Sequence, residues 1–128
     1  MQKLFAPENV YVSKSGIPNA GRGVFAKRDI KKGEIIEKCP MIEVPKGDVS
    51  KLRESVLVTY FFYFGNKKER LALALGFGSL YNHSAKPNAV YKVKPKETVI
   101  EFIALKDIKK DSEITFNYSN LGPLWFEV

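Results

Sequence analysis

Apolar and polar residues alternate along most of this chain, whereas the spacing typical of an amphipathic helix is rare. Alternation indicates strands with one buried face, because successive side chains of a strand point to opposite sides. Segments rich in Gly, Pro and Asn separate the runs and predict turns. The runs that predict strands are NVYVSK, VFAKRDI, EIIEKCPMIEV, VLVTYFFYF, KKERLALAL, NAVYKVK, TVIEFIAL and EITFNYS. The pattern therefore predicts a mainly β protein with about eight short strands.

Four segments predict more specific local structure. VLVTYFFYF favours strand throughout, because β-branched and aromatic residues suit a pleated surface. DVSKLRES predicts the start of a short helix with Asp48 or Ser50 as its N-cap. PKE, between NAVYKVK and TVIEFIAL, predicts a hairpin. NLGPLWFEV, broken by Gly and Pro, predicts an irregular tail that ends in aromatic residues.

One sequence pattern occurs twice. AKRDIKKGEII at residues 26–36 resembles ALKDIKKDSEIT at residues 104–115, with one extra residue before the Glu-Ile pair. Two copies are too few for a repeat array, which needs at least about three units. Each copy is therefore predicted to form a strand, a one-turn connection through Asp-Ile-Lys-Lys, and a second strand.

Composition indicates one globular domain. The chain has 128 residues, of which 45% are hydrophobic and 12% aromatic, enough for a substantial core. The apolar run at residues 56–65 is about half the length of a membrane span, and the N-terminus lacks the apolar segment of a secretion signal. One cysteine, Cys39, excludes an internal disulfide and a multi-cysteine zinc site. We therefore expect an intracellular protein with no membrane partner.

The chain is basic, with a formal net charge of +7 and a pI of about 9.5. Such a charge is typical of proteins that bind an anionic partner such as nucleic acid. However, the 21 Lys and Arg residues are spread from Lys3 to Lys110, and 14 acids lie among them. Charge alone therefore favours an ordinary basic surface over a nucleic-acid-binding function.

Gly21 and Gly23 flank Arg22 in NAGRGVFA, directly before a predicted strand. Glycine permits a positive φ and close approach of the backbone to a ligand. A strand rather than a helix follows, so the segment is not a dinucleotide-binding fingerprint. Taken alone, it indicates a tight turn.

His83 is the only histidine, and it lies in GFGSLYNHSAKPNAV. It has no second histidine and only the distant Cys39 with which to bind a metal, so no metal site is predicted. As a general base it lacks an obvious nucleophile, because the adjacent Ser84 side chain would point elsewhere. Taken alone, it indicates a structural, hydrogen-bonded residue.

Tyr118 lies at the end of the last predicted strand, EITFNYS. Alternation places it on the same face as Phe116. Taken alone, such a tyrosine indicates a core residue whose hydroxyl reaches solvent.

Together and in this order, GRGVFA, YNHSAKPNA and EITFNY resemble the motifs of the SET domain, the fold of many protein-lysine methyltransferases. DIKKGEII is also typical of that family. The resemblance extends from about Val10 to Phe126, and the length is similar to that of minimal stand-alone SET proteins of large DNA viruses and bacteria. Unlike many members, this chain cannot form cysteine-rich zinc flanks, and Ala85 and Lys86 stand where a cysteine is common.

The resemblance implies a β-clip-like architecture of several small curved sheets with one or two short helices. A knot-like threading of the C-terminal region would bring YNHS beside TFNY. Residues 1–128 would form a single SET domain with its core at about 10–118, and the aromatic tail at 119–128 would close the cofactor site.

The implied activity is methyl transfer from S-adenosylmethionine to a lysine amine of a protein, either a histone tail or a bacterial or viral protein. Tyr118 would be the catalytic residue. Tyr60, Phe116 and Tyr118 would line the substrate channel, and Phe116 would leave room for di- or trimethylation. The residues implied to bind the cofactor are Arg22, Gly23, Tyr60, Asn82, His83, Trp125 and Phe126.

Two alternatives remain open on the sequence. One is a SET-like module that binds cofactor or peptide without catalysis, and the other is a basic β domain that binds nucleic acid. For the enzyme, nucleic acid is not required and a homodimer is compatible with the small size. A bacterial member would act in the cytoplasm and a viral member in the host nucleus.

Overall fold

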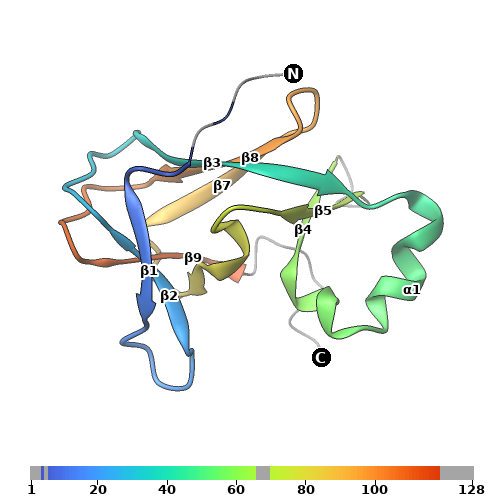
Figure 1. Cartoon of the computed structure of the whole chain (residues 1–128), viewed down its shortest axis with the longest axis horizontal. Coiled ribbons are helices and arrows are strands. Elements are labelled where there is room, and N and C mark those ends of the chain that lie inside the picture. Colours follow the sequence, from blue (N-terminus) through green and yellow to red (C-terminus); the bar gives the residue numbers. More distant parts are fainter. Residues whose placement is uncertain (1–3, 5, 66–69, 119–128) are drawn as a thin grey trace.

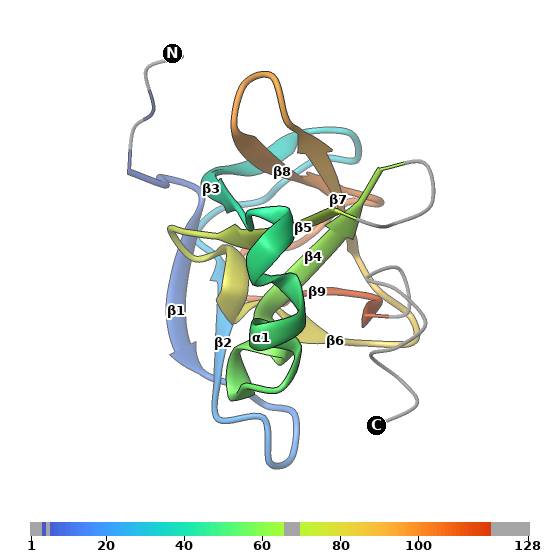
Figure 2. The same cartoon turned by 90° about the vertical axis from the view of Figure 1, so that its right-hand side faces the viewer.

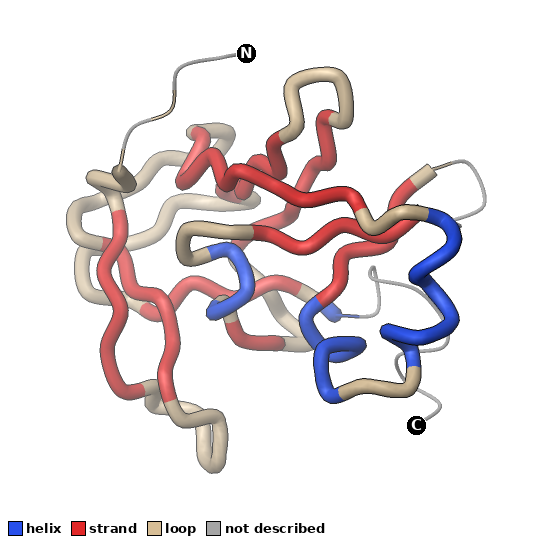
Figure 3. The backbone as a smooth tube through the Cα atoms, turned by 45° about the vertical axis from the view of Figure 1, so that its right-hand side comes forward, coloured by secondary structure: helices blue, strands red, loops and turns tan. Residues whose placement is uncertain are grey.

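The computed structural model describes residues 4, 6–65 and 70–118 (Figure 1). Strands are its main regular structure, and the helical segments are short (Figure 3). The strands are β1 (Val10–Lys14), β2 (Arg22–Ala26), β3 (Ile35–Glu43), β4 (Phe61–Phe64), β5 (Arg70–Ala74), β6 (Asn82–His83), β7 (Ala89–Lys94), β8 (Val99–Ala104) and β9 (Glu113–Phe116). The helical segments are α1 (Val49–Arg53) and the 3₁₀ turns η1 (Lys46–Asp48), η2 (Val56–Tyr60) and η3 (Gly78–Leu80). The predicted mainly β fold with short helices is confirmed.

The strands form two small sheets. One has the order β1-β2-β9-β6, and the other has the order β4-β5-β3-β8-β7. The pairs are antiparallel except β6 with β9, which run parallel. The predicted hairpin is confirmed as β7–β8, and α1 projects from one end of the molecule (Figures 1 and 2). The implied knot-like threading stays a prediction, because the tail after residue 118 lies outside the described residues.

A cluster of aromatic rings joins the two sheets. Phe102 of β8 is fully buried, and its ring lies 4.1 Å from that of Tyr81 and 5.6 Å from that of Phe116 in β9. Phe62 of β4 stacks on Phe116 at 5.7 Å. Burial of each ring contributes roughly 1.5–3 kcal/mol, so the cluster fixes β9 against the larger sheet.

The prediction of one strand through VLVTYFFYF is wrong for residues 56–60, which form η2. Ser55 Oγ accepts a hydrogen bond from the N–H of Leu57 and caps this turn. Val56 is 76% exposed, so it is not buried as the β-branched residues of strands usually are. Only the buried residues Phe61–Phe64 form strand.

The predicted short helix is confirmed as α1, with Asp48 at its N-cap position. The Asp48 side chain makes no capping hydrogen bond, however, and Ser50 lies inside the helix. Among the described residues, no helix has both the length and the apolar character needed to cross a bilayer.

The two similar Asp-Ile-Lys-Lys segments pair with each other. The backbones of Ile30 and Ile108 exchange two hydrogen bonds of 2.8 and 2.7 Å. Asp29 Oδ1 accepts a hydrogen bond from the Lys110 N–H at 2.8 Å, and Asp107 Oδ1 accepts one from the Lys32 N–H at 2.9 Å. The repeated sequence thus forms two halves of one reciprocal contact, which we call the paired turns (residues 26–34 and 104–112).

Candidate functional site

The parallel pairing of β6 with β9 brings two of the sequence motifs together. Asn82 lies opposite Thr115, and His83 lies opposite Phe116. Asn88 fixes this arrangement, because its Nδ2 donates to the Glu113 carbonyl and its Oδ1 accepts from the Thr115 N–H, both at 2.9 Å. The predicted proximity of YNHS and TFNY is confirmed. The hydrogen bonds of Asn88 explain the role of the asparagine in the Pro-Asn pair.

Asn82 is held by a network around Gly23. Its Nδ2 donates to the Arg22 carbonyl and to Glu113 Oε2, both at 2.9 Å. Ser15 Oγ donates to the other carboxylate oxygen of Glu113 at 2.8 Å. A Cβ at Gly23 would overlap the Glu113 carboxylate and lie 3.0 Å from Asn82 Nδ2. The missing side chain of Gly23 therefore makes room for this network, a role that the motif alone did not indicate.

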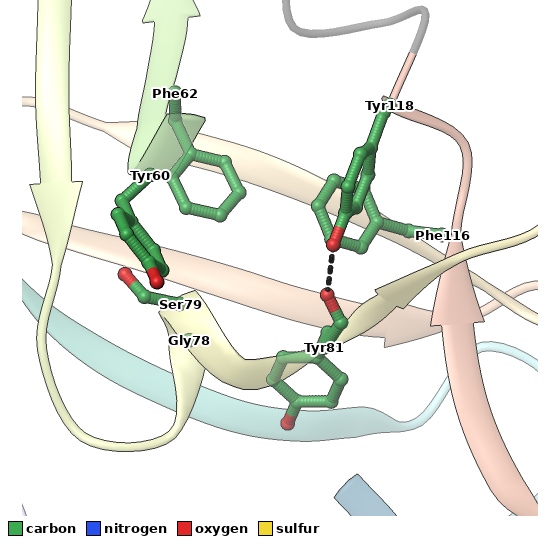
Figure 4. Close-up of a pocket in the computed structure, with 7 residues that line it drawn as sticks. All are labelled: Tyr60, Phe62, Gly78, Ser79, Tyr81, Phe116 and Tyr118. Atoms are coloured by element: carbon green, nitrogen blue, oxygen red, sulfur yellow. Dashed lines mark hydrogen bonds between the residues drawn. The ribbon is translucent and has the colours of Figure 1, made fainter. Parts of the chain in front are cut away.

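Tyr118 is held at both its backbone and its hydroxyl. Its N–H donates to His83 Nδ1 at 3.0 Å, and its O–H donates to the Tyr81 carbonyl at 2.7 Å (Figure 4). The ring lies 4.9 Å from that of Phe116 and 5.2 Å from that of His83. The exposed His83 side chain therefore positions Tyr118.

A narrow pocket opens beside the Tyr118 hydroxyl, and we call it the aromatic pocket. Its volume is about 10 Å³, which is the space for about one water molecule. Figure 4 shows the rings of Phe116 and Phe62 behind Tyr118 and Tyr60. The lining residues are Tyr60, Phe62, Gly78, Ser79, Tyr81, Phe116 and Tyr118.

A second, wider pocket of about 280 Å³ adjoins the first, and we call it the open pocket. Its lining residues are Ala20, Arg22, Tyr60, Ser79, Leu80, Asn82 and Tyr118. Three of these, Tyr60, Ser79 and Tyr118, also line the aromatic pocket. The two pockets therefore meet at the Tyr118 side chain, and a molecule in each could present reacting atoms to the other there.

A buried carboxylate supports the wall between the pockets. Glu37 is only 5% exposed; its Oε1 accepts from the Tyr81 O–H at 2.7 Å and its Oε2 from the Phe77 N–H at 3.0 Å. Phe77 and Tyr81 flank η3, which lines both pockets. Among the described residues, no Lys, Arg or His forms an ion pair with Glu37. Glu37 thus fixes η3 and the carbonyl that receives the Tyr118 hydroxyl.

The ionisable groups of the site favour their neutral forms. Burial, with a smaller contribution from nearby Tyr60, raises the pKa of Tyr118 to about 12. Burial and the Glu37 charge raise the pKa of Tyr81 well above its usual value. Burial raises the pKa of the Cys39 thiol as well, so this cysteine stays protonated and is a poor nucleophile. Tyr118 can therefore donate a hydrogen bond at neutral pH.

The structure brings together most of the predicted site residues. Tyr60, which is 43% exposed, lines both pockets, Phe116 closes the back of the aromatic pocket, and Arg22 and Asn82 line the open one. Trp125 and Phe126 lie outside the described residues. The described part holds no cluster of His, Cys, Asp or Glu able to bind a metal. The residues assigned to the site from the sequence did not include Ser15, Glu37, Tyr81, Asn88 and Glu113. Tyr81 and Asn88 lie in the motif YNHSAKPNA and Glu113 in EITFNY, and Glu37 is an acid inside an apolar strand.

Comparison with known proteins agrees with this geometry. A sequence model described as the SET domain matches residues 21–119. The "Histone-lysine N-methyltransferase, H3 lysine-37 specific" of Schizosaccharomyces pombe is 31% identical over 107 residues, which cover 84% of this chain and 71% of that protein. The "Histone-lysine N-methyltransferase EZH2" of Chaetomium thermophilum is 30% identical over 133 residues, 92% of this chain but 9% of that protein.

Solved structures have the same fold. A Plasmodium falciparum protein, described as a candidate histone methyltransferase, is 37% identical with a TM-score of 0.66, and the match covers 86% of this chain and 96% of that one. The Chaetomium thermophilum Polycomb Repressive Complex 2 bound to S-adenosylmethionine matches with 25% identity and a TM-score of 0.73. That match covers 93% of this chain and 16% of the other.

Proposed function

Because this chain belongs to the SET domain family, we propose that it transfers methyl groups from S-adenosylmethionine to lysine side chains of a protein, with histones as the substrate class. The observation that carries the proposal is the junction of the aromatic and open pockets at Tyr118. Two relatives named as histone-lysine methyltransferases support the substrate class. We extend the proposal to a single catalytic domain with its core at about residues 10–118.

The aromatic pocket suits an uncharged lysine amine. A free lysine has a pKa near 10.4, so keeping it neutral at pH 7 costs roughly 4–5 kcal/mol. Apolar walls disfavour the ammonium form, because burial in a medium of low dielectric constant penalises charge. The rings of Phe62 and Phe116 supply such walls. The substrate segment would bind as an added strand and insert its lysine.

The open pocket fits the methyl donor. Asn82 Oδ1 accepts no hydrogen bond from the described residues and can receive one from an ammonium group, while Arg22 can meet a carboxylate. When bound, S-adenosylmethionine supplies a sulfonium-activated methyl carbon. The ring of Tyr60 offers a surface for the apolar parts of S-adenosylmethionine. Trp125 and Phe126 are proposed to cover the adenine, although they lie outside the described residues.

Tyr118 would act by position rather than as a base. Its hydroxyl is fixed by the Tyr81 carbonyl beside the aromatic pocket, and the proposal puts the meeting point of the amine and the methyl donor at this hydroxyl. Holding reacting atoms in line can supply several kcal/mol of the barrier reduction. Tyr118, with its raised pKa, keeps its proton, so the amine must lose its own proton to solvent before attack. His83 contributes by fixing the Tyr118 backbone.

Phe116→Tyr is expected to shift the products towards monomethyl-lysine. Phe116 is 3% exposed and its ring lies 4.9 Å from that of Tyr118, so an added hydroxyl would occupy the end of a pocket of only about 10 Å³. A doubly methylated amine would then lack space. Mass spectrometry of the modified peptide measures this change. If the wild type also stops at one methyl, the assignment of Phe116 is wrong.

Binding of S-adenosylmethionine tests the cofactor assignment. Ligand that binds the folded state raises the melting temperature, so the wild type should show a concentration-dependent thermal shift. Asn82→Ala should weaken binding at least about tenfold, because it removes the acceptor and loosens Glu113. Calorimetry with both proteins, each checked for folding, measures the difference. Equal affinity of the wild type and Asn82→Ala would contradict the assignment of Asn82 to the cofactor site. No binding by the wild type would contradict the proposed function.

A further inference from the structure

The paired turns bring together basic residues that lie far apart in the sequence. They hold seven of the 21 Lys and Arg residues, four in residues 26–34 and three in residues 104–112. The hydrogen bonds between Ile30 and Ile108 place the two turns side by side at the end of the molecule opposite α1 (Figure 1). The fold therefore builds one basic surface from segments more than 70 residues apart.

The cations of this surface are exposed and almost all unpaired. Arg28 forms an ion pair with Glu34 at 2.8 Å. No lysine of the paired turns forms an ion pair within the described part of the chain. These exposed lysines are Lys27, Lys31, Lys32, Lys106, Lys109 and Lys110.

The acids of the paired turns accept hydrogen bonds from groups other than the lysine ammonium groups. Asp29 and Asp107 accept from backbone N–H groups across the contact. Glu34 accepts from Arg28 and from the Lys31 N–H, and Asp111 accepts from the Tyr11 hydroxyl at 2.8 Å. Seven cations less four carboxylates leave +3 on eighteen residues, against +7 on the whole chain. The lysine ammonium groups are thus left to face an external anion.

We infer that the paired turns bind the phosphate backbone of duplex DNA, independently of its sequence. Lysine ammonium groups act as point charges suited to phosphates. Neither turn contains an aromatic residue, so the stacking that holds single strands is missing there. Arg28, the residue best suited to read a base edge, is already bound to Glu34, Asn9 and the Asp29 carbonyl. Contacts to the backbone alone give affinity without sequence preference.

The surface lies within reach of the candidate site. Residues 104–112 lead directly into β9, and Tyr118 follows Lys110 by eight positions. An extended chain of that length spans at most about 28 Å. A duplex on the paired turns would therefore lie near the site without occupying either pocket. The inference does not depend on the proposed methyl transfer.

Fluorescence anisotropy with a labelled DNA duplex, measured over a range of salt concentrations, tests this inference. The test protein carries Lys31→Gln, Lys32→Gln, Lys109→Gln and Lys110→Gln. The matched control carries Lys46→Gln, Lys51→Gln, Lys92→Gln and Lys96→Gln, four exposed lysines near α1 and on the β7–β8 hairpin. Both variants change the net charge from +7 to +3. Circular dichroism checks that each is folded.

The wild type should bind with a steep salt dependence. The variant of the paired turns should bind at least about tenfold more weakly, with a slope of log K against log salt reduced by about 3 to 4, whereas the control should stay within about threefold. Tyr118→Phe should bind DNA like the wild type, which separates this surface from the methyl-transfer site. Equal losses of DNA affinity in the two lysine variants would overturn the inference. So would a wild type that binds single-stranded DNA more tightly than the duplex, or one that binds polyglutamate and not the duplex.

Discussion

Tyr118→Phe is expected to lower the single-turnover rate of methyl transfer by about 100-fold or more, while the free energy of unfolding falls by only about 1 kcal/mol. The change removes a hydroxyl whose hydrogen bond to the Tyr81 carbonyl is 2.7 Å long, at the junction of the two pockets. Loss of one positioning or stabilising donor at a reaction centre typically costs two to three orders of magnitude, roughly 10²–10³. Loss of one partly exposed hydrogen bond costs about 1 kcal/mol in stability.

Tyr91→Phe provides the matched control for this measurement. The Tyr91 hydroxyl also donates to a backbone carbonyl, that of Tyr63 at 3.1 Å, and burial also raises its pKa to about 12. Tyr91 lines neither pocket. Rapid-quench kinetics with product detection by mass spectrometry should therefore find the Tyr91→Phe rate within about threefold of the wild type. Equal losses in both variants would mean that Tyr118 acts only through packing.

The pH dependence follows from the same assignment. A raised pKa means that Tyr118 keeps its proton as pH rises, up to about pH 12. The rate should thus increase with pH as the substrate amine, with a pKa near 10.4, loses its proton. Ionisation of Tyr118 should not affect the pH dependence of this rate below about pH 10.

Glu37→Ala is expected to lower the free energy of unfolding by about 3–5 kcal/mol. The change leaves the Tyr81 hydroxyl and the Phe77 N–H without acceptors, and each buried unsatisfied group costs about 1–3 kcal/mol. A small cavity adds to the loss. Urea unfolding measures the effect.

Two control variants are expected to lose less stability than Glu37→Ala. Glu37→Gln keeps one oxygen for the Tyr81 hydroxyl and should cost only about 1–2 kcal/mol. Glu43→Ala removes an exposed acid of the same strand, whose ion pair with Arg70 is worth at most about 1 kcal/mol. If Glu37→Ala costs no more than Glu43→Ala, the carboxylate does not support η3.

Local sequence patterns predicted most of the strands, the hairpin and the short helix. They failed at residues 56–60, because strand preference there depends on burial that the fold does not provide. The motif residues Asn82 and Tyr118 were predicted from a family resemblance, and the structure brings them to one pocket. Their placement there rests on β6–β9 pairing between distant segments.

The contacts of the supporting residues could not be predicted from the sequence. Ser15 contacts Glu113 across 98 positions of sequence, and Tyr81 contacts Glu37 across 44. Neither contact follows a helix or strand period, so no local pattern indicates it. The same holds for the basic surface, which exists only because the paired turns meet.

The most direct test of methyl transfer uses the full chain, S-adenosylmethionine with an isotopically labelled methyl group, and core histones. Mass spectrometry of the digested histones locates the label. We predict labelled methyl groups on lysine Nζ with the wild type and none above background with Tyr118→Phe. A wild type that binds S-adenosylmethionine but labels no histone lysine would contradict the proposed substrate class and activity.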